Sequence, residues 1–453
     1  MKTLHVTYSF APDAVGGTEV YVEALARDLA AMGIEAVVAA PGPIDCRYLH
    51  DGLRIRRFAS DQRTLDIRDL YGRGEKGAAD AFDRILDDEK PDLVHQHALT
   101  AACSVQLAER ARRRGLPVVF TYHTPTVSCQ RGALLEMGNT VCDGRLDVAR
   151  CTACSLHGRG LASGLSRVLA KSPGVVSGLT EKAGLSGGAW TAVRMRALTE
   201  QRLTSLRTLF HDVDRFVALV PWVRALLVAN GVPESRIIDC RHGIPSARAT
   251  IDTRRRSPSD PLRVVHLGRL DPVKGTRLLL HAIAAIPDAP IELDVFGVVQ
   301  SHDDSSALAE LQSLVASDMR IRFRPPVDHA AVIERLATYD VVAVPSQTLE
   351  TGPLVVLEAF AAGVPVIGST LGGIADQVTD QVDGLLIRPH DSVDAWSAAF
   401  ARLCDDRALV DELRKGIHPV RRSIDVASDM ASLYQELMTP ALVSAAVASD
   451  VSL

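Results

Sequence analysis

The sequence predicts two α/β domains that face a central cleft, each built on a parallel sheet covered by helices. Short apolar runs alternate with helically spaced segments through both halves of the chain. The alternation breaks once, at the polar and strand-poor residues 246–261, and then restarts. With 453 residues the chain is too long for one ordinary core. We therefore expect a first domain at 1–245 and a second at 246–453.

Apolar runs bounded by turn residues predict the strands of the first domain. The helical spacing of Glu19–Met32 ends at Gly33, and an Arg-rich helix is expected between the third and fourth runs. The predicted strands are Leu4–Tyr8, Ala36–Ala40, Pro91–His95, Pro117–Thr121, Phe216–Val220 and Ile237–Cys240.

The second domain repeats this alternation. Its predicted strands are Leu262–Leu267, Ile291–Phe296, Val341–Val344, Val364–Ile367 and Gly384–Ile387. The helices expected between and after them are Thr276–Ile286, Ser305–Ser313, Ala330–Thr338, Pro353–Ala362 and Asp391–Leu403.

An insertion with a Cys-rich part and a helical part is expected in the first domain, at about 126–212. Its four cysteines are Cys129, Cys142, Cys151 and Cys154, and the last two form a C-x-x-C pair typical of half a zinc knuckle. In a reducing compartment such a cluster favours metal over disulfides. We therefore predict a structural Zn²⁺ site. An iron–sulfur cluster, or free thiols with one disulfide, are the alternatives.

Net charge and hydropathy limit the binding partners and the cellular location that we expect for the protein. The net charge of −5 gives no reason to expect nucleic acid as a partner, and no apolar stretch reaches the roughly 18 residues of a spanning helix. We expect a cytoplasmic protein. Residues 156–210 hold eight Lys or Arg and two Glu, so this segment could contact the inner face of a membrane or hold an acidic acceptor. A solvated helical hairpin is the simpler alternative.

The strongest chemical signal is a pair of glutamates around a helix start. Glu350 precedes Pro353, which suits the first turn of a helix, and Glu358 falls about a turn and a half inside it. The helix N-terminus offers free amides and a positive dipole end to a phosphate. One carboxylate could then face a sugar and the other a ribose. The alternative is one capping and one surface glutamate.

Two upstream loops also have phosphate-binding character. Arg269 and Lys274, five apart after an apolar strand, could clamp a diphosphate, although a basic loop bonded only to solvent is the common alternative. Gly16 and Gly17 follow the first strand and would let backbone amides approach phosphate closely. The G-x-G-x-x-G spacing is absent there, which argues against a dehydrogenase.

The order of these motifs, followed by Gly363–Ile367 and Gly372-Gly373, resembles the retaining family-4 glycosyltransferases. The resemblance implies the GT-B fold, with two Rossmann-like domains and a last helix, about 424–438, that crosses back onto the first domain. It implies transfer of a sugar, with retention, from a nucleotide-diphosphate sugar to a hydroxyl acceptor. That acceptor would be a glycan, a lipid-linked molecule or a small molecule in polysaccharide, glycolipid or glycoconjugate synthesis.

The resemblance also implies roles for individual residues. Arg269 and Lys274 would neutralise the leaving diphosphate, so that no catalytic metal is expected. Glu358 would bind the ribose, and Glu350 with the amides around Gly352 and Leu354 would hold the transferred sugar. The remaining donor contacts would be the Gly17 amide, His123 at a strand end and the segment ending at Val327 near the base.

Some assignments stay open. His123 could instead be a packed strand-end histidine, and His95 and His97 are interpreted as packing residues. Pro353 stands where the family commonly has glycine, and it has no amide to donate to the sugar. The sequence does not separate UDP from GDP. The rival functions are a non-catalytic or membrane-recruited subunit with this fold, or a phosphorylase or epimerase on the same fold.

Overall fold

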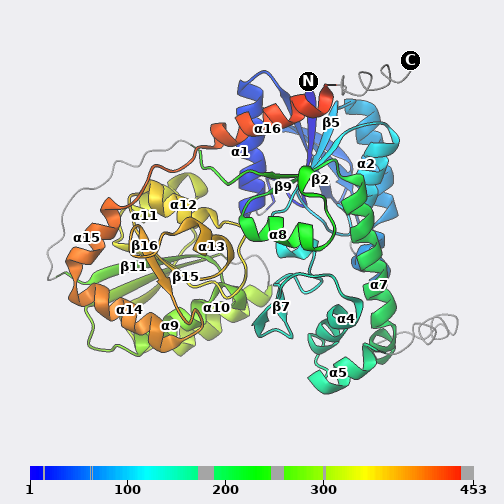
Figure 1. The fold of residues 1–453 in the computed structure, drawn as a ribbon. Helices are drawn as coiled ribbons and strands as arrows, with labels where there is room; N and C mark the ends of the chain where they lie inside the picture. Colours follow the sequence, from blue (N-terminus) through cyan, green and yellow to red (C-terminus); the bar gives the residue numbers. More distant parts are fainter. Residues whose placement is uncertain are drawn as a thin grey trace, which may run out of the picture.

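The computed structural model describes residues 1–13, 16–61, 63, 65–171, 188–245, 260–298 and 302–439. Two sheets with helices packed around them make up two α/β domains (Figure 1). Each sheet has a buried apolar cluster on either face. Most of the predicted linker, 246–259, and the tail from 440 lie outside the described residues.

The first domain contains an eight-stranded sheet in the order β10-β9-β6-β5-β1-β2-β4-β3, parallel except for the pair β3–β4. Its strands are β1 Lys2–Val6, β2 Glu35–Gly42, β3 Cys46–His50, β4 Leu53–Ala59, β5 Leu93–Gln96, β6 Val118–Thr121, β9 Arg215–Ala218 and β10 Ile237–Asp239. The six predicted strands are present. The edge strand β3 and its neighbour β4 were not predicted, because three arginines interrupt the apolar pattern of β4.

The second domain contains a six-stranded parallel sheet in the order β13-β12-β11-β14-β15-β16. Its strands are β11 Leu262–Arg269, β12 Ile291–Val298, β13 Ile321–Arg324, β14 Val341–Val344, β15 Val366–Ser369 and β16 Gly384–Ile387. The five predicted strands are present. The edge strand β13 was missed because its sequence alternates arginine with apolar residues and carries only one buried residue.

Helices cover both sheets. Those of the first domain are α1 Gly17–Ala31, α2 Lys76–Glu89, α3 Val105–Arg113 and α8 Pro221–Ala229, and those of the second are α9 Thr276–Ala284, α10 His302–Leu314, α11 Val332–Leu336, α12 Leu354–Ala361, α13 Gly372–Gln377, α14 Val393–Asp405 and α15 Arg407–Lys415. The last helix, α16 Ser423–Met438, packs against α1 of the first domain (Figure 1). Its Met430 and Tyr434 are fully buried there.

Between β6 and β9 the chain forms a small hairpin, β7 Leu135–Glu136 with β8 Thr140–Val141, and the helices α4 Val148–His157, α5 Ser163–Leu169 and α7 Gly188–Asp212. Residues 172–187 of the predicted helical part lie outside the described residues. Leu165 and Val168 are exposed on α5, but contact with a membrane stays a prediction. None of the helices in the described residues is long and apolar enough to cross a bilayer.

Candidate active site

The loop between β14 and α12 carries Glu350, and its carboxylate meets Lys274. Glu350 Oε1 accepts hydrogen bonds from Lys274 Nζ at 2.6 Å and from Ser346 Oγ at 2.7 Å. Lys274 ends the short 3₁₀ helix that follows β11, and Gly275 comes next at φ +74°. A Cβ on Gly275 would lie 1.9 Å from the Pro345 carbonyl oxygen, so only glycine permits this approach of the two loops.

The same loop is bonded to the first domain. The Glu350 carbonyl accepts from Trp222 Nε1 of α8 at 2.8 Å and from the Gly373 amide at 2.7 Å. Thr351 Oγ1 donates to the His123 carbonyl after β6, and Thr348 Oγ1 donates to the Ala133 carbonyl. The loop therefore lies at the boundary between the domains, where both contribute to its geometry.

The start of α12 differs in detail from the prediction. Pro353 is the N-cap, with an extended ψ of 128°, and the helix begins at Leu354. Gly352 precedes it at φ +94°, and a Cβ there would lie 3.2 Å from His242 Cδ2 of the first domain. Gly17, at the start of α1, faces the same helix end, because a Cβ added to Gly17 would lie 3.8 Å from Leu354 Cδ1. The predicted pair Gly17 and Leu354 thus meets across the domain boundary.

Arg269, at the end of β11, extends toward the first domain. Its side chain is 49 % exposed, and the Asp271 carboxylate lies 3.7 Å away. Burial, with a contribution from the nearby Glu19, raises the pKa of Tyr8 to about 12, while the Arg269 charge acts on Tyr8 in the opposite direction. Tyr8 therefore lies near both the Gly16 turn and Arg269. Sequence reasoning did not single it out, although it ends the first predicted strand.

The turn at Gly16 is anchored by a buried carboxylate. Glu19 accepts hydrogen bonds from the Gly16 amide at 2.8 Å and from Thr7 Oγ1 at 3.2 Å. Burial raises the pKa of Glu19, although these hydrogen bonds oppose the shift. The contacts hold the glycine turn at the start of α1, against Leu354.

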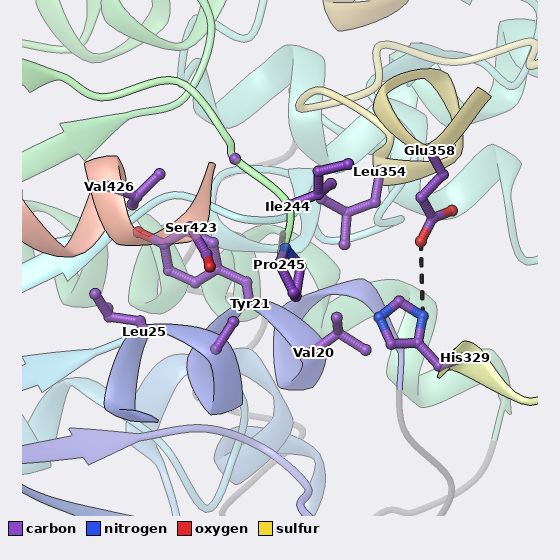
Figure 2. A pocket seen from close by; sticks show the side chains of 12 residues that line it. Val20, Tyr21, Leu25, Ile244, Pro245, His329, Leu354, Glu358, Ser423 and Val426 are labelled. Carbon is purple, nitrogen blue, oxygen red and sulfur yellow. Dashed lines mark ion pairs between the residues drawn. The ribbon is translucent and has the colours of Figure 1, made fainter. Parts of the chain in front are cut away.

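Glu358 lines a crevice between the domains (Figure 2). The crevice encloses about 350 Å³, counting its open side, and Tyr21 of α1 and Pro245 line its other walls. Glu358 is 6 % exposed, and its carboxylate lies 3.6 Å from His329 Nδ1. Burial raises its pKa to about 7, because the carboxylate loses water there. Glu350, paired with Lys274, lies in a different environment eight positions earlier.

Val327 lies beside the apolar cluster that contains Phe296 and Val344, in the second domain. Its segment directly precedes His329, which closes the Glu358 crevice. The structure therefore places the predicted base-side segment next to the glutamate predicted for the ribose. The contact of this segment with a base stays a prediction.

His123 is buried beside the domain boundary, in a network that the sequence did not reveal. Its Nε2 lies 3.1 Å from His97 Nδ1, and its ring packs edge-on against Tyr21 with centroids 4.8 Å apart. Burial lowers the pKa of His123 well below its ordinary value. His95 and His97 are buried, as expected of packing residues, but all their ring nitrogens are hydrogen-bonded. The interpretation as packing residues alone was therefore incomplete.

A second cavity lies in the first domain, near the ends of β5 and β6. It encloses about 840 Å³, counting its open side, and Thr100, Thr126 and Cys129 are among its lining residues. Arg202 of α7 lines it and is 9 % exposed, and its Nη2 donates to the Thr126 carbonyl. Its Nε has no hydrogen-bond partner, and within the described residues no carboxylate forms an ion pair with it.

Two further lining groups of this cavity, Ser104 Oγ and Gln130 Oε1, are buried without a hydrogen-bond partner in the part of the chain that the structure describes. Unpaired buried polar atoms are costly, so a polar cavity lined by three of them suits a polar ligand. Parallel α/β sheets bind ligands beyond the carboxyl ends of their strands, which is where this cavity opens. Sequence reasoning missed Arg202, since nothing in the basic segment distinguished it from its neighbours.

The four predicted metal ligands line one cavity between the β7–β8 hairpin and α4. Cys142 Sγ accepts from the Gly144 amide at 3.5 Å, and Cys154 Sγ accepts from the Met137 amide at 3.3 Å. All four are free thiols. Across the described residues no three of their sulfurs lie within 4.8 Å of one another, so the side chains would have to turn inward to share one ion.

Comparison with known proteins agrees with this architecture. Residues 16–238 match the glycosyl transferase 4-like domain model, and residues 247–418 match the model of glycosyl transferases group 1. A D-inositol 3-phosphate glycosyltransferase of Xylanimonas cellulosilytica is 26 % identical over 93 % of this chain and 92 % of its own.

Solved structures with the same fold include the sucrose-phosphate synthase of Thermosynechococcus elongatus, with a TM-score of 0.65 and 20 % identity over 96 % of this chain and 98 % of that one. Anabaena Alr3699/HepE in complex with UDP-glucose has a TM-score of 0.61 and 14 % identity over 96 % and 100 %. The fold is therefore GT-B. The chain belongs to the group 1, family-4-type glycosyltransferases, and it is a glycosyltransferase.

The raised pKa of Glu358 predicts a pH dependence of stability. The folded protein holds this proton up to about pH 7, whereas the unfolded chain releases it near 4.5. Stability should therefore fall as pH rises from 4.5 to 7, by up to about 3 kcal/mol. In urea unfolding series, Glu358→Gln should remove this loss, while Glu412→Gln, at an exposed site on α15, should keep it. Equal pH profiles for the two variants would contradict the assignment.

The cysteine cavity predicts a bound structural metal. Elemental analysis of the pure protein should find about one zinc per chain. Cys151→Ser should lose the metal and melt at a lower temperature, whereas Cys46→Ser, at an exposed cysteine outside the cavity, should keep both. Iron with acid-labile sulfide would identify the cluster alternative instead. A folded sample without metal would refute the site.

Proposed function

We propose that this glycosyltransferase moves a sugar from a nucleotide-diphosphate donor to a hydroxyl acceptor with retention of anomeric configuration. The observation that carries the proposal is the meeting of two loops at the domain boundary. Lys274 reaches Glu350 at 2.6 Å, and Gly17 faces Leu354 at the start of α12. A donor diphosphate placed there would meet cationic side chains and unpaired helix amides together.

Each donor group then has a candidate partner. Arg269 and Lys274 neutralise charge on the diphosphate as it leaves, with the α12 amides and the Gly17 amide beside it. Glu358 accepts hydrogen bonds from the ribose hydroxyls, which enter the crevice that it lines. Glu350, held by Lys274 and Ser346, accepts a hydroxyl of the transferred sugar. Val327 and its neighbours flank the base.

Retention follows from attack on the face that the leaving group departs from. The acceptor oxygen forms its bond to the anomeric carbon as the bond to the diphosphate breaks, and the leaving phosphate oxygen takes the acceptor proton. The protein supplies position and charge rather than a nucleophile. Several described contacts support this role, because the Glu350 carbonyl, the Thr351 hydroxyl and the Thr348 hydroxyl each tie the sugar-binding loop to the first domain.

Arg269→Ala tests the donor site. A thermal-shift and turnover screen over UDP and GDP sugars should yield a donor, and Arg269→Ala should lower kcat/KM for it about 100-fold. The matched control is Arg277→Ala, because the two arginines are 49 % and 48 % exposed and Arg277 forms an ion pair with Glu310 on the surface. Equal activity of the two variants would contradict the assignment. Binding without turnover would favour the non-catalytic subunit.

The Arg202 cavity supports an acceptor that carries an anionic group. A guanidinium that is nearly buried without a carboxylate partner gains most from a phosphate or carboxylate ligand. The relative in Xylanimonas is named for D-inositol 3-phosphate, a phosphorylated polyol. For this protein we propose only the class of acceptor, which is a hydroxyl compound that carries a negative charge.

Arg202→Gln tests the acceptor class. Thermal shifts with D-inositol 3-phosphate and with inositol should show preference for the phosphorylated compound, and Arg202→Gln should abolish that preference. Arg207→Gln, at an exposed site on the same helix, should retain it. Donor affinity should be the same in all three proteins. Equal responses to both polyols in the wild type would contradict an anionic acceptor at this cavity.

A further inference from the structure

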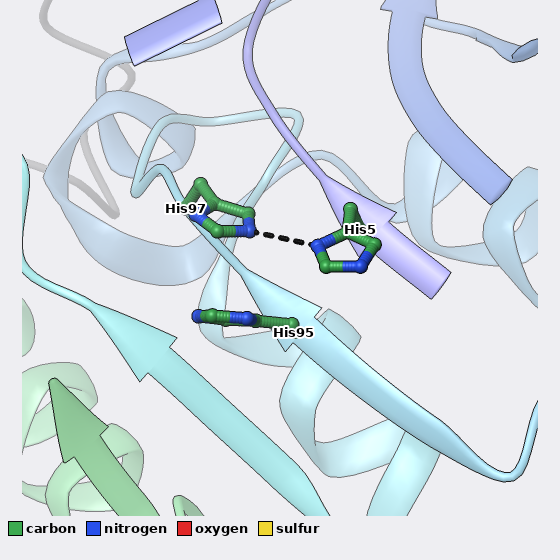
Figure 3. A group of neighbouring side chains, drawn as sticks. All are labelled: His5, His95 and His97. Carbon is green, nitrogen blue, oxygen red and sulfur yellow. Dashed lines mark hydrogen bonds between the residues drawn. The ribbon is translucent and has the colours of Figure 1, made fainter. Parts of the chain in front are cut away.

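A chain of hydrogen bonds runs from β1 through the sheet to His123. Thr3 Oγ1 lies 3.0 Å from His5 Nε2, His5 Nδ1 lies 3.2 Å from His97 Nε2, and His97 Nδ1 lies 3.1 Å from His123 Nε2. Figure 3 shows the contact between His5 and His97, with His95 beside them. Thr3 and His5 are fully buried, and His97 is nearly so. Nothing in the donor chemistry described above uses Thr3, His5 or His97.

The hydrogen-bond chain has a defined donor direction, which is set at its Thr3 end. Thr3 Oγ1 donates to the Glu35 carbonyl oxygen at 3.4 Å, and a carbonyl oxygen can only accept. Because the hydroxyl has one proton, Thr3 must then accept from His5 Nε2–H. A neutral imidazole carries one N–H, so His5 accepts at Nδ1 from His97 Nε2–H. By the same reasoning, His97 accepts at Nδ1 from His123 Nε2–H.

We propose that Thr3, His5 and His97 are positioning residues that fix His123 as its Nε2–H tautomer, so that His123 offers a bare Nδ1 to a hydroxyl of the bound sugar. Only the identity of that ligand rests on the proposed function. Within the described residues His123 Nδ1 makes no hydrogen bond, and it is not among the fully buried unpaired atoms. The His123 carbonyl is already bonded to Thr351 of the sugar-binding loop, which brings the ring to that loop.

Burial supports neutral rings throughout the chain. It lowers the pKa of His5 to about 3 and the pKa values of His97 and His123 well below the ordinary range. Neutral rings are required, because an imidazolium would donate at both nitrogens and break the chain. The tautomer of His123 is then set by the Thr3 hydroxyl, which lies three hydrogen bonds away along the chain.

The same histidines could be mistaken for a metal site, since ring nitrogens of His5, His95 and His97 lie within 4.8 Å of one another. All six of their ring nitrogens already have hydrogen-bond partners. His95 bonds to Tyr434 and Thr121, while His5 and His97 bond to each other and to Thr3 and His123. A dication would have to displace these bonds inside a buried core, which favours the hydrogen-bond chain.

The test compares Thr3→Ser with Thr3→Val in the full-length protein. Long-range ¹⁵N–¹H NMR with ¹⁵N-histidine labelling reports the tautomer of each ring, and the signal lost in His123→Gln identifies His123. Wild type and Thr3→Ser should show the Nε2–H tautomer. Thr3→Val removes the hydroxyl anchor at similar volume, so His123 should shift toward a mixture of tautomers. Thermal melts confirm that both variants are folded.

Ligand binding provides a second measurement. Thr3→Val should bind the nucleotide sugar about 3–10-fold more weakly than Thr3→Ser, and both should bind the nucleoside diphosphate alone equally well. An Nδ1–H tautomer in the wild type, an unchanged His123 in folded Thr3→Val, or one bound metal per chain that His95→Gln removes would each overturn the proposal. If no nucleotide sugar binds to any form, the proposed function fails while the NMR result still decides the chain.

Discussion

The Glu350 carbonyl is the constraint on which the candidate site depends. One oxygen accepts from Trp222 Nε1 of the first domain and from the Gly373 amide of the second. Because a carbonyl has two lone pairs, both are used, and the loop before α12 is fixed relative to both domains. The Glu350 carboxylate can then point toward Lys274, and the Leu354 side chain at the start of α12 meets Gly17.

Two carboxylates eight positions apart lie in different surroundings. Glu350 accepts hydrogen bonds from the Lys274 ammonium and the Ser346 hydroxyl. Glu358 is buried in a crevice beside His329, and burial raises its pKa to about 7. The first arrangement suits an acceptor for a hydrogen bond from a sugar hydroxyl.

The sequence predicted the parts of this site that depend on local pattern. Strand ends and helix starts placed Arg269, Lys274 and Glu350 on loops and Glu358 inside the helix that follows, since motifs of this kind are short and contiguous. The parts of the site that depend on contacts between segments distant in sequence were not predicted. Trp222, Tyr8 and Arg202 become significant only when segments that are distant in the sequence fold beside them. The hydrogen-bonded histidines were not predicted for the same reason, because β1, β5 and β6 are far apart in the sequence and become neighbours only in the sheet.

The most direct measurement of the central claim is a crystal structure of the protein with bound nucleoside diphosphate. We expect the diphosphate between the domains, within hydrogen-bond distance of Arg269, Lys274 and the Leu354 amide, with the ribose at Glu358. Phosphates held by one domain alone, away from Lys274 and the start of α12, would contradict the account.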